Sequence, residues 1–306
     1  MKGDLERPLE DFIARTLGPC RLVPAPSRPG QGGVRELVDR DGVRWFLKRL
    51  ELAPQWAGEV RAYRHWVPAL GDHAPTMKAC DEGLRAIVLS TAPGRPVTED
   101  DPAAHRRAGQ LLRRLHSSRP ERPVTDHVHV RARRRLEWEL SSGFAGMLSE
   151  AEIRFAQDQV ERMGGLRFAA QVPCHGDFGP HNWLVDEAGV VRVIDFADSR
   201  WHVPGFDFTR LYHRAWWERT DLGDAFFEGY GRQPTSDEQE FVRLHLVINA
   251  VTSVRWGHKN HDAELLTLGH DRLGALMAGR WTPTSGVTSL ASTQVRRLRL
   301  RRRWRG

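Results

Sequence analysis

Residues 175–182 read His-Gly-Asp-Phe-Gly-Pro-His-Asn, and residues 193–196 read Val-Ile-Asp-Phe. Asp177 and Asn182 lie five positions apart, and Asp195 follows two apolar residues, as a carboxylate at the end of a strand would. A carboxylate can orient and deprotonate a hydroxyl group, and amide and carboxylate oxygens are the hard ligands that suit Mg²⁺. A single aspartate near glycines is most often a turn residue, so the interpretation depends on the three residues occurring together.

These three residues match the parts that phosphoryl transfer to an alcohol requires. The reaction needs a carboxylate for the hydroxyl, oxygen ligands for Mg²⁺ on the phosphates, and cationic groups that offset charge on the transferring group. The spacing of Asp177 and Asn182 is that of the aspartate and asparagine in a kinase catalytic loop. The pattern His-Gly-Asp-x-x-x-x-Asn, followed by Ile-Asp-Phe, resembles the aminoglycoside phosphotransferase and choline kinase superfamily, relatives of protein kinases that phosphorylate small molecules.

The resemblance implies a role for each of these side chains. It implies that Asp177 is the catalytic base and that Asn182 and Asp195 are ligands of Mg²⁺. It also implies that Asp207 is a structural hydrogen-bonding residue, and it matches residues 112–117 to the family's Leu-x-x-Leu-His helix end. Only eleven residues separate Asp195 from Asp207, which leaves no room for an activation loop and argues against a protein substrate.

Upstream, the resemblance extends to a lysine and a glutamate. Lys48 follows Phe46 and Leu47 at the end of an apolar strand and matches the lysine that binds nucleotide phosphates. Glu59, eleven residues later on the next predicted helix, is the expected ion-pair partner that positions this lysine. The alternatives are that Lys48 is a surface lysine and that Glu59 is an ordinary solvated helix residue.

Two further segments are expected to contact the nucleotide. The run at residues 27–33 contains Gly30 and Gly32 and is expected to cover the phosphates, although it lacks the Gly-x-Gly-x-x-Gly order of protein kinases. The hinge residues Ser90, Thr91 and Ala92 are expected to offer backbone groups to adenine. The resemblance as a whole covers roughly residues 20 to 280.

Histidines and aromatic residues leave alternatives open. His175 and His181 are candidate ligands, with Asp177, for a softer metal that favours imidazole, whereas a role for His175 in holding the loop is the preferred interpretation. Aromatic and histidine side chains in the C-terminal half are candidates either for the acceptor site or for the core. They are Trp201, His202, Trp216, Trp217 and Trp256.

The net charge of +7 comes entirely from the C-terminus. Residues 293–306 contain seven arginines and no acidic residue, and without them 39 basic residues balance 39 acidic ones. Arginine is abundant throughout and lysine is rare, which is typical of a GC-rich genome and is weak support for nucleic-acid binding. We therefore expect residues 281–306 to form a disordered basic tail, with nucleic acid an improbable partner.

The remaining composition favours a cytoplasmic protein. Three scattered cysteines form neither an even set nor a Cys-x-x-Cys pair, which fits a reducing compartment. The first residues lack the apolar core of a secretory signal, and no apolar run is long enough to span a membrane.

The pattern of elements predicts an α+β, bilobal protein-kinase-like fold. Residues 34–38 and 43–50 read as a β-hairpin joined by Asp39-Arg40-Asp41-Gly42, and residues 86–89 as a further strand. Helical periodicity dominates after residue 100, with one continuous helical pattern over 208–230, while 174–185 reads as turn. We place the nucleotide-binding lobe at 1–92 and the catalytic, acceptor-binding lobe at 93–280.

The predicted function is transfer of phosphate from ATP, with Mg²⁺, to a hydroxyl group of a small molecule. Within the superfamily we favour an antibiotic acceptor, aminoglycoside-type or other, and hence resistance or self-protection. The alternatives are a metabolic kinase of the choline, homoserine or sugar type, an inert nucleotide-binding scaffold, and a nucleic-acid-binding protein that rests only on the tail.

Overall fold

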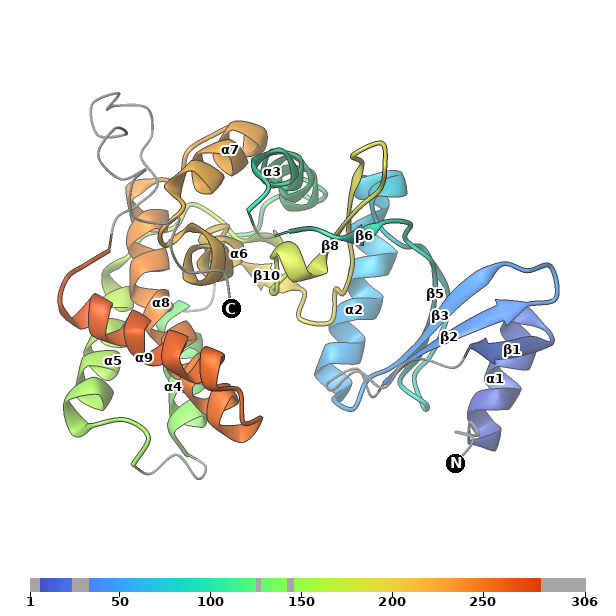
Figure 1. The fold of residues 1–306 in the computed structure, drawn as a ribbon, viewed down its shortest axis with the longest axis horizontal. Helices are drawn as coiled ribbons and strands as arrows, with labels where there is room; N and C mark the ends of the chain where they lie inside the picture. The colour runs from blue at the N-terminus through green and yellow to red at the C-terminus, as the bar shows by residue number, and fades with distance from the viewer. Residues whose placement is uncertain (1–5, 24–32, 99, 125–127, 142–145, 282–306) are drawn as a thin grey trace, which may run out of the picture.

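A computed structural model describes residues 6–23, 33–98, 100–124, 128–141 and 146–281 (Figure 1). A β-sheet with helices α1 and α2 forms the N-terminal part, and a mainly helical part follows it. The expected α+β, bilobal architecture is therefore correct. The tail beyond Trp281 lies outside the described residues, and so do Gly30 and Gly32.

The N-terminal sheet has five antiparallel strands in the order β1-β2-β3-β5-β4. The expected hairpin is present, because the carboxylate of Asp39 accepts hydrogen bonds from the backbone of Asp41 and Val43 and so closes the turn. The strands are β1 (Cys20–Val23), β2 (Val34–Asp39), β3 (Arg44–Arg49), β4 (Met77–Asp81) and β5 (Ala86–Ser90).

Strand β5 has both faces buried, so its side chains enter two different cores. Ala86 and Val88 pack with α1 (Arg7–Leu17), whereas Ile87 and Leu89 belong to the main core that continues into the helical part. This alternation follows from the two-residue period of a strand. The helix α2 (Ala53–His65) contributes Val60, Ala62 and Tyr63 to the main core, and a 3₁₀ segment at Val67–His73 follows it.

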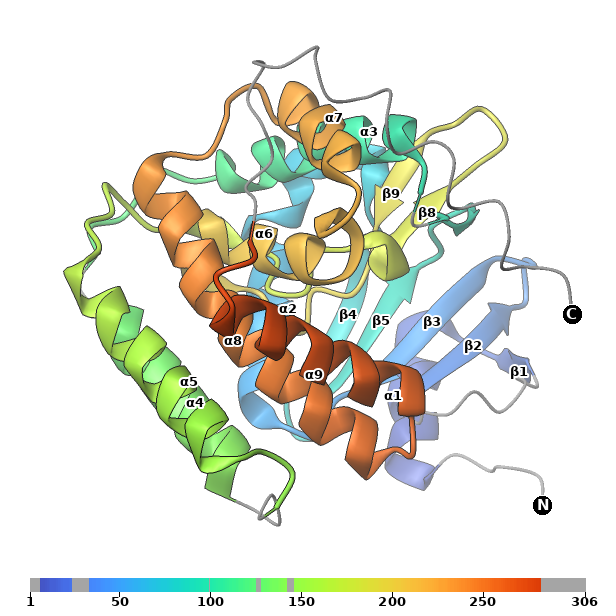
Figure 2. The same ribbon diagram turned by 60° about the vertical axis from the view of Figure 1, so that its left-hand side comes forward.

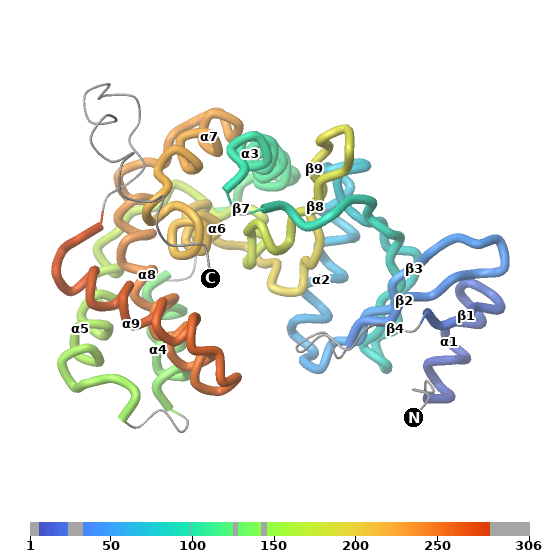
Figure 3. The backbone as a smooth tube through the Cα atoms, in the orientation of Figure 1, coloured from blue at the N-terminus to red at the C-terminus, as the bar shows by residue number. Residues whose placement is uncertain are grey.

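The chain leaves the sheet after β5 and enters the helical part through β6 (Arg95–Pro96), as the tube in Figure 3 shows. The predicted lobe boundary at 92/93 lies in this connection. Two small antiparallel sheets, β6-β8-β9 and β10-β7, have strands on either side of the loop at residues 175–182 in the chain. Their strands are β7 (Val172–Cys174), β8 (Trp183–Val185), β9 (Val191–Val193) and β10 (Arg200–His202).

Seven α-helices surround these strands in the part of the chain that the structure describes, and Figure 2 shows α4 and α5 lying alongside α8. They are α3 (Pro102–His116), α4 (Val128–Ser141), α5 (Glu150–Arg162), α6 (Gly205–Leu211), α7 (Thr220–Tyr230), α8 (Ser236–Lys259) and α9 (Ala263–Met277). Among the described helices, none combines the length and apolarity needed to cross a bilayer.

Two expectations about local structure were wrong. The helical pattern over 208–230 is interrupted, because α6 passes into a π-helical turn at Tyr212–Trp216 and α7 begins only at Thr220. The segment 174–185 is turn-like, as expected, up to the 3₁₀ turn Pro180–Asn182, but its last three residues form the strand β8. Three-residue strands are too short for a periodic pattern to reveal.

Helices α3 and α7 pack unusually closely because glycines lie at their contact. A Cβ atom on Gly109 of α3 would overlap the carbonyl oxygen of Phe226, and one on Gly229 of α7 would overlap that of Arg106. This contact also aligns the C-terminal ends of the two helices, His116 on α3 and Tyr230 on α7, beside each other.

We expect Gly109→Ala to destabilise the fold by about 1–3 kcal/mol, because the added methyl group meets backbone that must shift. Gly274→Ala on α9 is the matched control: a Cβ there meets no neighbouring atom, so better helix propensity should stabilise by roughly 0.5–1 kcal/mol. Thermal unfolding of the two variants checks the pair. Equal effects of the same sign would contradict the close α3–α7 contact.

Candidate active site

A single buried carboxylate anchors the loop that begins at His175. Asp207 on α6 accepts hydrogen bonds from the backbone N–H groups of His175 (2.8 Å) and Gly176 (2.7 Å). Its Oδ2 atom also lies 3.0 Å from Nε2 of His116 at the end of α3. The two backbone donors and the imidazole fix where the loop starts, and this is the structural role expected for Asp207.

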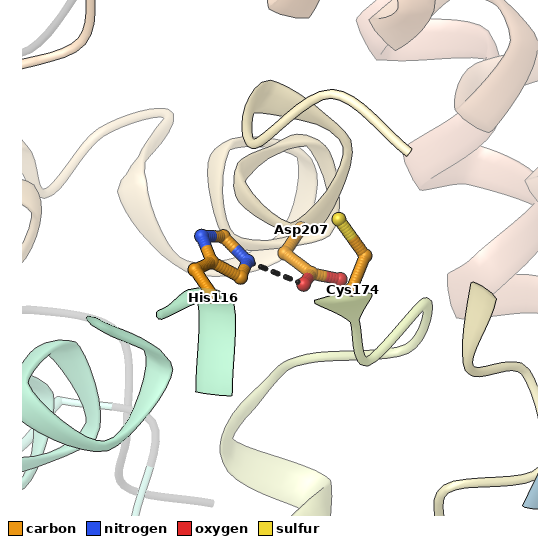
Figure 4. A group of neighbouring side chains, drawn as sticks. All are labelled: His116, Cys174 and Asp207. Carbon is orange, nitrogen blue, oxygen red and sulfur yellow. Dashed lines mark hydrogen bonds and ion pairs between the residues drawn. The ribbon is translucent and has the colours of Figure 1, made fainter. Parts of the chain in front are cut away.

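His116 is itself held from its other side, by the hydroxyl group of Tyr230. Its Nδ1 atom lies 2.8 Å from that oxygen, so both ring nitrogens have partners. Figure 4 shows His116, Asp207 and Cys174 together, a grouping that in principle suits a metal ion. Burial raises the pKa of the Cys174 thiol well above its ordinary value. Both ring nitrogens of His116 and both oxygens of Asp207 have hydrogen-bond partners within the protein, so the group acts as a hydrogen-bonded support.

Glycine is required at the second position of the motif. Gly176 has φ +88°, and a Cβ atom there would overlap the carbonyl oxygen of Asp198. The left-handed conformation and the close approach both exclude a side chain. This turn carries the chain from the anchored backbone of His175 to Asp177, whose side chain is 24% exposed.

The peptide of Ile194 joins the loop to the segment that carries Asp195. Its N–H donates to the carbonyl of Asn182 (3.0 Å), and its carbonyl lies 3.1 Å from Nε2 of His175. The N–H of Asp177 approaches Nδ1 of His175, so the proton of this imidazole belongs on Nε2. With both nitrogens engaged inside the protein, His175 holds the loop and is no metal ligand.

Lys48 connects the N-terminal sheet to this site. Its ammonium group lies 2.9 Å from Glu59 on α2 and 2.6 Å from Asp195. Burial alone would lower the pKa of Lys48, but the carboxylates of Glu59 and Asp195 raise it, so the lysine is charged. The expected pairing of Lys48 with Glu59 is present, which rules out a surface lysine and a solvated glutamate.

Asp195 combines a strained backbone with an exposed side chain. Its φ is +66°, uncommon for a residue other than glycine, and its side chain is 47% exposed. Such conformations persist where the surrounding structure enforces them, and they gather at functional sites. The carboxylate is thus presented to solvent beside the cation of Lys48.

Asp177 is surrounded by donors. Nε of Arg210 lies 2.7 Å from its Oδ1 atom, and Nε2 of His181 lies 3.3 Å from its Oδ2 atom. The Asn182 amide donates to the Asp177 carbonyl oxygen at 2.9 Å. Burial would raise the pKa of Asp177, but His181 and Arg210 together hold it well below its usual range. The side chain is therefore an anion that can accept hydrogen bonds.

Other predicted site residues lie at the edge of this arrangement. Ser90 ends β5, and its hydroxyl oxygen accepts from the backbone of Thr76, while Thr91 and Ala92 follow in the connection to β6. Trp216 and His202 are buried in the core. Trp201 and Trp217 pack partly buried against the core, and Trp256 is exposed on α8.

Sequence reasoning missed Arg210 and Tyr230. Arg210 lies three residues after Asp207 on α6, so helical spacing places both on one side of the helix, and this is the signal that was available. Tyr230 lies 114 positions from His116, and nothing in the local sequence links the two.

Asp207→Asn should destabilise the protein by about 3–5 kcal/mol at pH 7, because one carboxylate oxygen becomes an amide that faces donors in a buried site. Burial raises the pKa of Asp207, but the hydrogen bond and charge of His116 lower it below the ordinary value. Its stabilising effect is therefore complete above about pH 4 and is lost as the pH falls through the lowered pKa.

Unfolding of wild type and Asp207→Asn at pH 7 and below pH 4 checks this, and the difference should shrink in acid. Asp221→Asn, which breaks an exposed pair with Arg219, is the control and should change stability by less than about 1 kcal/mol. A loss for Asp207→Asn as small as that of the control would mean that the anchor is unimportant.

Comparison with known proteins gives the family and the fold. The sequence profile of the phosphotransferase enzyme family matches residues 31–245, whereas no curated protein matches the chain. Among solved structures, the GDP and kanamycin complex of an APH(2″) enzyme is 14% identical, with a TM-score of 0.66 over 90% of this chain and 100% of that one.

Two further solved structures are similar to this chain. The apoenzyme of macrolide 2′-phosphotransferase MphH from Brachybacterium faecium is 17% identical, with a TM-score of 0.58 over 87% of this chain and 96% of that one. A thermostable mutant of APH(4)-Ia is 14% identical, with a TM-score of 0.64 over 88% and 98%. At these identities the structures establish the fold, and the profile establishes the family: the chain belongs to the phosphotransferase enzyme family.

Proposed function

We propose that this protein transfers the γ-phosphoryl group of ATP, with Mg²⁺, to a hydroxyl group of a small molecule. The observation that carries the proposal is the convergence of three kinds of group. The cation of Lys48 contacts Asp195, and the backbone of Ile194 ties Asp195 to Asn182, which in turn contacts Asp177. These are the cation, the metal-ligating oxygens and the carboxylate that phosphoryl transfer requires.

The residues present fit a nucleotide with Mg²⁺. The carboxylate of Asp195 is half exposed, and the Asn182 amide uses its nitrogen toward Asp177, which leaves its oxygen on the other side. Two hard oxygen donors on adjoining segments suit Mg²⁺, which would neutralise charge on the phosphates when bound. Lys48, oriented by Glu59, would bind phosphate oxygens, and the segments at 27–33 and 90–92 would lie along the nucleotide.

Asp177 is the residue that would meet the acceptor. It lies at the end of a loop whose start is fixed by Asp207, and it is ionised, so it can orient a hydroxyl group and accept its proton. The link between Asp195 and Asp207 contains β10 and little else, so no activation-loop segment is present to position a protein substrate. A small molecule is the better acceptor.

An antibiotic is the acceptor we favour. Similar structures include an APH(2″) enzyme with kanamycin, another with streptomycin and ATP, and a macrolide phosphotransferase. Their acceptors differ chemically, so the fold permits more than one class. A metabolic kinase is the second candidate, and a specific observation favours it. Arg210 lies against the carboxylate of Asp177, and the charge of Arg135 interacts with that of Arg210, which is unsuited to a polycationic aminoglycoside.

Mg-ATP should raise the melting temperature, because a ligand that binds only the folded state stabilises it, by about 2.7 kcal/mol at 100 times Kd. Asp195→Ala should abolish most of this shift by removing a metal ligand. Asp41→Ala, in the exposed hairpin turn, is the control and should retain it. A full shift in Asp195→Ala would place the metal elsewhere, and a parallel scan with Mg-GTP compares the two nucleotides.

Phosphate transfer from radiolabelled ATP should occur to at least one compound in a panel of aminoglycosides, macrolides, nucleosides, choline, homoserine and sugars. An Asp177→Ala, Asp195→Ala double variant measures the background. Labelling of proteins in a cell extract, with no small molecule accepting phosphate, would overturn the proposed acceptor class.

A further inference from the structure

Arginines from three different elements lie close enough for their charges to interact, and one of them contacts Asp177. Arg135 comes from α4, Arg200 from β10 and Arg210 from α6, and their side chains are 47%, 45% and 37% exposed. The charges of all three act on His245, which is buried on α8 and whose pKa burial lowers to about 3, with these arginines adding to the shift. Helices α4 and α6 both pack on α8, and Figure 2 shows α4 lying alongside it. The charge of Arg135 on α4 interacts with those of Arg210 and Arg200.

Each of these arginines has one carboxylate partner, and one of the three carboxylates is shared with a fourth arginine. Arg135 pairs with Glu139, which Arg255 also contacts from α8, and Arg200 lies 3.6 Å from Asp198. Burial lowers the pKa of Arg135, and the charges of Arg210 and Arg200 lower it further despite the two carboxylates.

Two additional arginines lie near Arg200 or near its neighbour. Arg61 lies close enough to Arg200 and to Arg122 for their charges to interact, and burial together with these neighbours lowers the pKa of Arg61. Arg122 stacks on Trp201, 3.9 Å from the ring centroid, and Arg131 donates to the carbonyl oxygen of the same tryptophan.

Arg210 connects this region to the reacting carboxylate. Its Nε atom lies 2.7 Å from Oδ1 of Asp177, so a positively charged group already lies where an acceptor hydroxyl must approach. A cationic acceptor would be repelled by Arg210 and Arg135. An acceptor with an oxyanion would instead compete with Asp177 for Arg210, because guanidinium groups bind carboxylates and phosphates through paired hydrogen bonds.

We propose that Arg135, Arg200 and Arg210 form an acceptor-specificity surface that binds a small hydroxylated molecule carrying an oxyanion, a carboxylate or phosphate. The proposal rests on the proposed phosphotransferase function and narrows its acceptor. This surface would repel polycationic aminoglycosides, because the arginines and the aminoglycoside amines carry the same charge. The oxyanion draws the guanidinium of Arg210 from Asp177, which frees that carboxylate for the hydroxyl group.

Matched pairs of hydroxyl compounds that differ in one charged group test this proposal. The full-length protein, saturated with Mg-ATP at fixed ionic strength, is offered glycerol 3-phosphate and glycerol, gluconate and sorbitol, uridine monophosphate and uridine, and kanamycin. Phosphate transfer gives kcat/KM, and calorimetry on protein saturated with a non-hydrolysable ATP analogue gives Kd. We expect at least one anionic compound to exceed its neutral counterpart tenfold or more in either measurement.

Arg135→Gln and Arg210→Gln should each reduce this preference about tenfold, the usual effect of losing a hydrogen bond to a charged group. Arg133→Gln is the matched control: Arg133 is on the same helix, is equally exposed at 45% and pairs with Glu161, so the preference should be unchanged. The readout is the ratio of kcat/KM between the anionic compound and its neutral counterpart. A general loss of folding or of base strength lowers kcat/KM for both compounds equally and leaves this ratio unchanged.

The proposal is overturned if no anionic compound exceeds its neutral counterpart, if kanamycin is the better acceptor, or if the preference survives in both arginine variants. Turnover of neutral or cationic acceptors would leave the phosphotransferase function intact while removing this inference. Absence of any Mg-ATP-dependent thermal shift or turnover would instead remove the function on which the inference rests.

Discussion

The carboxylate of Asp207 is the constraint on which the rest of the site depends. It is almost completely buried, and it offers its two oxygens to the backbone of His175 and Gly176 and to the ring of His116. A charge buried in this way is tolerated only when donors surround it, so the two segments that supply the donors, the loop start and the end of α3, must be in place together. The loop with Asp177 therefore has a fixed origin.

Further contacts extend from this anchor in two directions. Toward the outside, the hydroxyl of Tyr230 fixes His116, and the close contact of α3 with α7 fixes Tyr230. Toward the site, His175 binds the carbonyl of Ile194, whose N–H holds Asn182. The positions of Asn182 and Asp195 thus follow from the same buried network that positions Asp177.

The ion pair between Lys48 and Asp195 is a polar link between the N-terminal sheet and the segment that follows the 175–182 loop. Neither side chain depends on this pair alone, because Lys48 also binds Glu59 and Asp195 is half exposed to solvent. A phosphate group bound beside Lys48 would be repelled by the carboxylate of Asp195. A metal cation would attract both the phosphate and this carboxylate, which is the physical reason for expecting a metal ion with the nucleotide.

The sequence predicted which polar residues come together in the site better than it predicted the helices and side chains around them. The residues Asp177, Asn182 and Asp195 stand at fixed local spacings, and Lys48 follows a strand whose hairpin turn is clear, so local pattern was sufficient. Arg210 and Tyr230 were missed because their contacts depend on how α6, α7 and α3 pack. The break in the pattern over 208–230 was missed because a π-helical turn keeps nearly the same apolar spacing as the α-helix around it.

The most direct test of the central claim is the turnover of Asp177→Asn with an accepted small molecule, measured together with Mg-ATP binding. The substitution keeps the shape of the side chain but removes its charge and its capacity to accept a proton. We predict that kcat falls roughly 10² to 10⁴-fold, the usual contribution of a positioned general base, with the thermal shift by Mg-ATP preserved. Near-normal kcat in the folded variant would contradict the account.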